Sequence, residues 1–238
     1  DDKQKLSEFI EHWIKEKINL ILKSLIDLKN LKESNSSIKA LAYQLYENNG
    51  VIKRESVVNY LKDLGQDERR ILRDLGVKFG RYHIFLFKLL KPEAVSLRIL
   101  LWKNFNQKCF ELKPPTFGLN FLEEKNFKNS KFMLLCGFEK FDNFFVRIDI
   151  LERLFVQIIN SNPNDKTEIK LIPEMLNLLG CNKDNFIKLI KKMNYKTIEK
   201  DKEFYFKYMP AKKSDKKYHK KTEIINNPFG VLKNINFK

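Results

Sequence analysis

Apolar side chains near the start of the chain recur every three or four residues. Between Leu6 and Leu25 they share one face, with Glu and Lys opposite, which predicts a long amphipathic helix. A polar cluster at 33–37 ends this helix, and its serines can cap a second helix at 38–47, which stops at the Asn-Asn-Gly of 48–50. Further short helices are predicted at 54–64 and 67–75. Residues 1–75 therefore form a predicted helical subdomain.

The most apolar part of the chain is residues 75–102. It opens with a basic-aromatic segment between glycines, continues through the apolar run 84–90, and enters a helix with Pro92 in its first turn. A surface element could not tolerate so many apolar positions, so this stretch is predicted to be the central buried element. It begins a predicted central core of residues 76–161.

Arg98 lies on an apolar face of that helix, beside Leu97 and Leu101. A buried guanidinium needs a partner, because an unpaired buried charge is strongly unfavourable. We predict a structural ion pair between Arg98 and Glu152, with Asp149 as the second choice. The alternative is a contact from Arg98 to a ligand.

The rest of the central core is predicted from shorter patterns. Pro114-Pro115 ends the helix, and 116–131 is predicted to be a polar loop. Residues 133–138 and 144–148 are predicted to be extended, around a turn at 140–143. A helix then runs to about Asn160 and carries Glu152 at the edge of its apolar face.

Residues 162–210 are predicted to form a winged-helix-like unit. After the turn at 162–165 come helices at 172–179 and 183–193, and then a hairpin of 195–198 with 204–208. Nucleic-acid-binding proteins use the second helix of such a unit for contact, and here it carries Lys188, Lys191 and Lys192. Many units of this shape only hold other domains together, so both roles stay open. The predicted fold class is mainly α, a helical accessory region with short β pieces and this unit.

Residues 211–238 are predicted to be a basic tail that carries a short apolar island. The segment 211–221, AKKSDKKYHKK, has almost no apolar content and suits sequence-independent phosphate contact, with Lys212 and Lys213 as candidates. The island at 227–232, NPFGVL, is typical of a docking peptide.

Charge and composition narrow the classes of partner. Among 238 residues, 46 Lys and Arg exceed 30 Asp and Glu, for a net charge of +16. This favours a polyanion, either nucleic acid or an anionic membrane surface, although a compositional bias of the source gives the same pattern. No apolar run is long enough to cross a membrane. The scattered cysteines favour a reducing, cytoplasmic environment. The start, Asp-Asp-Lys directly before a strong helix, suggests a piece of a longer protein.

The sequence carries no recognisable catalytic or ligand-binding motif. The sequence has no phosphate-binding loop, no HExxH and no GxSxG, and His12, His83 and His219 are far apart. The cysteines have no zinc-ligand spacing. We therefore predict no catalytic residue, no metal and no cofactor in this chain.

The basic-aromatic segment is the first candidate site for a single strand. Lys78, Arg81, Tyr82 and His83 lie between or beside glycines, which allow close backbone approach. Basic groups bind phosphates while an aromatic face accepts a base. Alternatively, Phe79 and Tyr82 are core residues and the charges form a solvated rim.

Several segments resemble a bacterial helicase family related to the mitochondrial degradosome RNA helicase. Residues 75–102, LGVKFGRYHIFLFKLLKPEAVSLRILLW, are similar to its block LGVRFGR…FLPALLKP…LRALLW. Further similar segments follow in the same order: PP at 114–115, GL at 118–119, CGF at 136–138, VRIDILERL at 146–154, LLGC at 178–181 and NPFGVL at 227–232. Phe87 stands where the family usually has Ala, and Ile150 where it often has Met.

The resemblance implies that this region follows two RecA-like motor domains that hydrolyse ATP with Mg and translocate along nucleic acid. Because the motor motifs are absent here, it implies a non-catalytic C-terminal accessory region. The implied partners are single-stranded RNA or DNA and the upstream motor domains, with no membrane. The alternatives are a stand-alone winged-helix DNA-binding protein and a protein-interaction scaffold.

Overall fold

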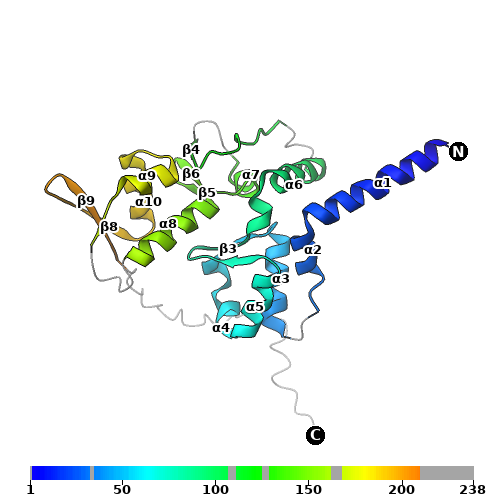
Figure 1. The fold of residues 1–238 in the computed structure, drawn as a ribbon, viewed down its shortest axis with the longest axis horizontal. Coiled ribbons are helices and arrows are strands. Elements are labelled where there is room, and N and C mark those ends of the chain that lie inside the picture. The colour runs from blue at the N-terminus through cyan, green and yellow to red at the C-terminus, as the bar shows by residue number, and fades with distance from the viewer. Residues whose placement is uncertain (1, 33–34, 107–110, 125–128, 162–167, 210–238) are drawn as a thin grey trace, which may run out of the picture.

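The computed structural model describes residues 2–32, 35–106, 111–124, 129–161 and 168–209. Helices dominate this part of the chain, and its strands form small antiparallel sheets (Figure 1). A mainly α fold with short β pieces is therefore confirmed. The predicted candidates Lys212 and Lys213, the rest of the basic tail and the island at 227–232 lie outside the described residues.

The N-terminal helices lie close to their predicted positions. The long predicted helix is divided at Leu22, and α1 projects from the body of the molecule with no buried residue (Figure 1). Asn35, rather than a serine, caps α3, because its side chain accepts a 2.8 Å bond from the Ser37 N–H. The helices are α1 (Asp2–Ile21), α2 (Lys23–Lys29), α3 (Ser36–Glu47), α4 (Val58–Asp63) and α5 (Gln66–Asp74).

The first sheet joins these helices to the central stretch. Asn49 and Gly50 have positive φ, as predicted for the end of α3, and lead directly into β1 (Val51–Lys53). This strand was not predicted, because three residues are too few to reveal an alternating pattern. The order is β1-β3-β2, so β3 (His83–Leu86) lies in the middle and is buried throughout. The strand β2 (Val77–Phe79) and the short helix η1 (Arg54–Val57) complete this region.

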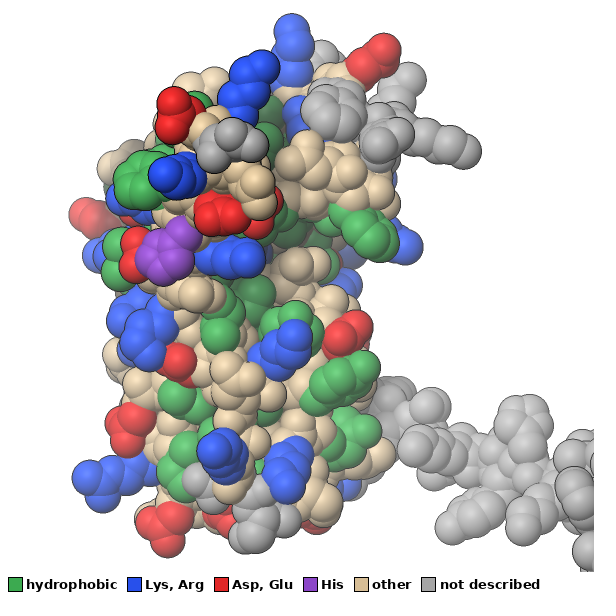
Figure 2. All heavy atoms as spheres, turned by 90° about the vertical axis from the view of Figure 1, so that its right-hand side faces the viewer, with side chains coloured by type: hydrophobic (Ala, Val, Ile, Leu, Met, Phe, Trp, Pro, Cys, Tyr) green, Lys and Arg blue, Asp and Glu red, His purple; other side chains and the backbone are tan. Residues whose placement is uncertain are grey.

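The central apolar stretch is buried only in part. The short helix η2 (Phe87–Leu90) leads into α6 (Pro92–Phe105), where Pro92 occupies the first turn as predicted. Ala94, Val95, Arg98 and Ile99 of α6 are buried, but Leu100, Leu101 and Phe105 are exposed, Phe105 by 89%. Seen from the side on which α1 projects, hydrophobic side chains lie among Lys and Arg (Figure 2). The prediction of a fully buried element is therefore wrong for the end of α6.

The second sheet and its neighbouring helix require two corrections. Residues 116–131, predicted to be a polar loop, include the strand β4 and the start of the helix α7. Residues 133–138, predicted to be extended, are the end of α7 followed by a turn and the start of β5. Asn129 caps α7 by accepting from the Phe132 N–H at 3.0 Å, and Gly137, with φ of 90°, separates the helix from the strand. The order is β4-β6-β5. The elements are β4 (Phe121–Glu123), α7 (Ser130–Leu135), β5 (Phe138–Phe141), β6 (Phe144–Arg147) and α8 (Ile148–Ser161).

The last described region has two helices and a hairpin, as predicted, with a short strand added at one edge. Gly180 ends α9 in the left-handed conformation, with φ of 69°. The sheet order is β7-β9-β8. The elements are β7 (Ile169–Lys170), α9 (Pro173–Leu179), α10 (Lys183–Lys192), β8 (Tyr195–Lys200) and β9 (Glu203–Tyr208).

Hydrophobic contacts cross two of the three predicted internal boundaries. One cluster runs from Leu22 to Ala94 and so spans the boundary at 75/76. Another runs from Phe144 to Phe206 and spans the boundary at 161/162. A third cluster, from Val95 to Phe145, lies wholly within the predicted central core.

Arg98 is buried as predicted, but its predicted partners are wrong. Its guanidinium donates to the backbone carbonyls of Asn49 at 2.8 Å, Leu89 at 2.6 Å and Leu135 at 3.1 Å. Glu152 contacts a different part of the chain, and Asp149 pairs with Arg147 through two 2.7 Å bonds. Burial lowers the pKa of Arg98 to about 10, so the side chain remains a cation at neutral pH.

Candidate nucleic-acid interface

The turn between β2 and β3 is held by one buried carboxylate. The Glu152 side chain of α8 accepts from three consecutive backbone N–H groups, those of Arg81 at 2.5 Å, Tyr82 at 2.9 Å and His83 at 2.7 Å. Successive N–H groups that converge in this way form an anion-binding nest. A Cβ at position 80 would overlap the Glu152 carboxylate, so Gly80 is required by this close approach.

His83 lies between two carboxylates beneath this turn. Its Nδ1 is 3.1 Å from Glu152 and its Nε2 is 3.3 Å from Glu139, whose other oxygen pairs with Lys53 at 2.7 Å. Burial opposes protonation of His83, but hydrogen bonds to Glu139 and Glu152 prevail and raise its pKa above 6.5. Burial likewise opposes ionisation of Glu139, while hydrogen bonds from His83 and Lys53 lower its pKa. The network thus alternates positive and negative groups.

This network predicts that stability depends on pH. Because the pKa of His83 is raised on folding, its stabilising contribution is fully present below pH 6.5 and is lost as the pH rises through the raised value. Glu139 acts in the opposite sense, losing its contribution as the pH falls below 4.5. We expect the free energy of unfolding, measured in urea, to decrease above pH 6.5, and to decrease less in His83→Gln. Equal pH slopes in the two proteins would contradict this assignment.

A cleft of about 450 Å³ opens above the network. Its walls come from three separate places: the turn with Arg81 and Tyr82, the segment with Lys53 and Arg54, and the end of α10 with Lys192. Four of the lining side chains are cationic, and two, Glu55 and Glu139, are acidic. Lys53 is paired with Glu139 at 2.7 Å, and Lys192 is paired with Asp142 at 2.9 Å. The cleft therefore presents a cationic surface beside an aromatic ring.

Arg81 and Tyr82 are fixed in place by aromatic contacts. The Arg81 guanidinium lies 4.9 Å from the Tyr208 ring centroid and 5.9 Å from that of Tyr82. Tyr82 packs edge-on against Phe155 at 4.6 Å, and its hydroxyl donates to the Met193 carbonyl at 3.4 Å. The Tyr82 ring therefore packs against the core on one side and lines the cleft on the other, and the residue as a whole is half-buried.

The predicted site residues divide into two groups. Arg81, Tyr82 and Lys192 come together in the cleft, although the turn and α10 are far apart in sequence. Lys78, Lys188 and Lys191 are exposed but do not line it.

His83 requires a correction. It contributes to the cleft floor but is only 3% exposed, and both ring nitrogens contact carboxylates, so its role is structural. The prediction of a nucleic-acid contact through the His83 ring is therefore wrong.

Sequence reasoning missed Lys53 and Arg54. The available signal was a pair of adjacent cations directly after two apolar residues and an Asn-Gly turn. Arg54 is attached to the turn twice, through its N–H to the Tyr82 carbonyl at 2.8 Å and its guanidinium to the Gly80 carbonyl at 2.9 Å. Arg54 therefore helps to hold the turn and its own segment together at the cleft.

Comparisons with protein-family models, curated proteins and solved structures found no match to this chain. Among the residues that the structure describes, none of the helices is both long enough and apolar enough to span a membrane.

Proposed function

We propose that this chain is the non-catalytic C-terminal accessory region of an ATP-dependent RNA/DNA helicase and binds single-stranded nucleic acid in the cleft. The cleft carries the proposal, because it unites Arg81 and Tyr82 with Lys53, Arg54 and Lys192 from distant segments. Phosphates bind the cations, and the half-buried Tyr82 ring contacts a base. The net charge of +16 adds long-range attraction for a polyanion.

In this proposal the motor domains hydrolyse ATP with Mg, and the whole protein acts in the cytoplasm. The accessory region docks on them through α1 and the exposed end of α6. Six large apolar side chains of α1 are exposed, and its four lysines are balanced by four acidic residues. A neutral helix with an exposed apolar face suits a protein partner better than phosphates. The exposed apolar side chains of α1 are Leu6, Phe9, Ile10, Trp13, Ile14 and Leu20.

The first test is the salt dependence of single-strand binding. Arg81→Ala with Lys192→Ala should weaken binding of a labelled oligonucleotide and reduce the slope of log K against log salt by about 1.4, at about 0.7 per lost phosphate contact. The backbone N–H of residue 81 remains, so Glu152 keeps its donors. Fluorescence anisotropy over a range of salt concentrations measures both quantities.

The matched control is Lys78→Ala with Lys188→Ala. It removes the same charge from the same two regions, but neither residue lines the cleft. We expect it to leave the affinity and the slope nearly unchanged. Equal losses in the two double variants would show that net charge, rather than the cleft, determines binding.

A second candidate function is duplex DNA binding by α10. Phe186, Leu189 and Ile190 of this helix are buried, whereas Lys188 and Lys191 are exposed. This is the arrangement expected of the second helix in a winged-helix unit. Lys188→Ala with Lys191→Ala would then weaken duplex binding while leaving single-strand binding in place.

A further inference from the structure

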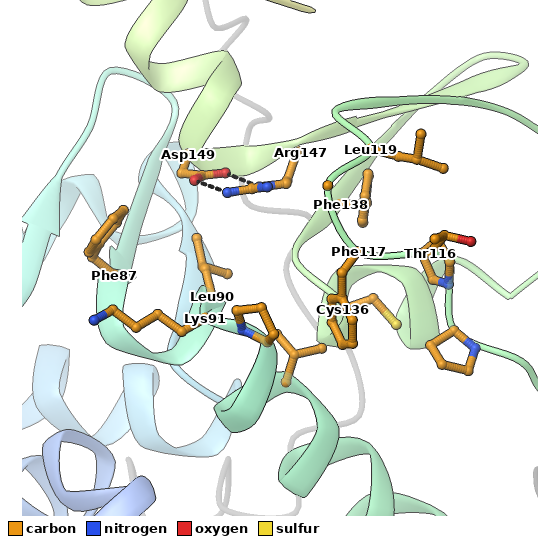
Figure 3. A pocket seen from close by; sticks show the side chains of 15 residues that line it. Phe87, Leu90, Lys91, Thr116, Phe117, Leu119, Cys136, Phe138, Arg147 and Asp149 are labelled. Carbon is orange, nitrogen blue, oxygen red and sulfur yellow. Dashed lines mark hydrogen bonds and ion pairs between the residues drawn. The ribbon is translucent and has the colours of Figure 1, made fainter. Parts of the chain in front are cut away.

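A second, smaller cavity of about 140 Å³ lies apart from the cationic cleft. Figure 3 shows it between the η2–α6 junction, with Phe87, Leu90 and Lys91, and the segment with Thr116, Phe117 and Leu119. Cys136 and Phe138 form part of its lining and are buried. Burial raises the pKa of Cys136 to about 12, so this thiol is neutral at physiological pH and adds to the apolar lining.

The rim of this cavity exposes large apolar side chains to water. Phe87 is 44% exposed, Phe117 52% and Leu119 45%. The polar side chains Arg147 and Asp149 lie together along one wall and bond each other (Figure 3), so they present a neutralised pair. An apolar, uncharged occupant fits such a site.

The size of the cavity restricts that occupant. A cavity of about 150 Å³ lined by apolar side chains accommodates a benzene molecule. One phenylalanine ring therefore fits, with a neighbouring apolar residue against the exposed rim. The apolar face of a docking helix presents a row of several anchors and needs a longer groove.

We propose that residues 227–232 of this same chain, NPFGVL, dock on this surface with the Phe229 ring in the cavity. The segment is an apolar island that follows the lysine-rich run 211–221. Pro228 restricts the backbone before the aromatic anchor, which lowers the entropy lost on docking. Gly230 then allows close approach to the rim.

The connecting chain is long enough for this contact. Phe229 lies 20 positions after Met209, the last described residue, and an extended chain of that length spans about 66–72 Å. A compact chain of this size has a radius of gyration of about 17 Å. This reach exceeds the diameter of a compact chain of that radius, so the island can reach the cavity from the end of β9.

The test uses the full chain and a fluorescent peptide with the sequence of residues 224–235. In the parent chain the attached segment competes with the peptide at an effective concentration in the millimolar range. The peptide should therefore bind the Phe229→Ala chain about tenfold more tightly than the parent, if its own dissociation constant is about 0.1 mM. Amide hydrogen exchange at Thr116–Leu119 should be faster in Phe229→Ala than in the parent.

Controls locate the contact. Phe117→Asp, added to the Phe229→Ala chain, should abolish peptide binding, whereas Phe105→Asp, also an exposed phenylalanine on the same molecule, should not. A peptide in which its phenylalanine is replaced by alanine should not bind. Equal binding to the parent and the Phe229→Ala chain would overturn docking within the chain. Absence of peptide binding, or binding unaffected by Phe117→Asp, would overturn the proposed site.

Discussion

Replacing Glu152 by alanine is expected to lower the free energy of unfolding by about 3–5 kcal/mol, as when one side of a buried charge pair is removed. The substitution removes the acceptor for three backbone N–H groups of the turn and for His83. These donors lie where burial restricts replacement by water, and an unsatisfied buried donor is costly. Urea unfolding followed by circular dichroism measures the loss.

The controls for this prediction lie on the same helix. Arg153→Ala removes an exposed charge from α8 and should change stability by about 0.5 kcal/mol or less. Glu152→Gln keeps the shape and one acceptor oxygen, but its NH₂ group points towards other donors. Its loss of stability should therefore fall between those of Glu152→Ala and Arg153→Ala. A Glu152→Ala chain as stable as Arg153→Ala would show that the turn does not depend on this carboxylate.

The same substitution should also weaken single-strand binding. Arg81 and Tyr82 are positioned for the cleft by the turn that Glu152 holds. If nucleic acid binds in the cleft, the Glu152→Ala chain should lose affinity even under conditions in which it remains folded. This couples the stability of the turn to the proposed function.

Local signals in the sequence were sufficient for most of the helices. Pro92 marks the start of α6, and the left-handed residues at Asn49, Gly76 and Gly180 follow α3, α5 and α9. These signals work because a cap or a helix end depends on a few neighbouring residues. The prediction for residues 133–138 was wrong because a short apolar run fits either a strand or a buried helical turn.

Contacts between distant residues could not be predicted in the same way. Helical periodicity correctly showed that Arg98 and Glu152 point inward, but it could not identify what they meet. Each was therefore paired with the other, because both carry a charge on or beside an apolar helix face. Both instead bind backbone groups. Every segment of the chain carries such groups, so the sequence does not indicate which of them a side chain will meet. For the same reason, Lys53 and Arg54 were missed as part of the cleft. They come to it because β1 pairs with β3, a contact between distant segments.

Arg98→Ala is likewise expected to lower the free energy of unfolding by about 3–5 kcal/mol, because a buried charged donor to three carbonyls is lost. All three carbonyls lie at or near the ends of helical segments: Asn49 follows α3, Leu89 lies in η2, and Leu135 is the last residue of α7. Carbonyls at the C-terminal ends of helices carry partial negative charge. This charge explains why the buried Arg98 cation bonds to backbone carbonyls.

Arg98→Met and Arg98→Lys separate this explanation from simple packing. Methionine fills much of the same volume, so it should restore stability if Arg98 only fills space. If the carbonyl bonds matter, Arg98→Met should remain strongly destabilised, because the carbonyls of Asn49, Leu89 and Leu135 stay buried without this donor. Lysine supplies the charge but not the planar fork that reaches several acceptors at once, so Arg98→Lys should recover only part of the loss. Urea unfolding of the three variants at one pH decides the matter, and a methionine variant as stable as the parent would contradict the carbonyl explanation.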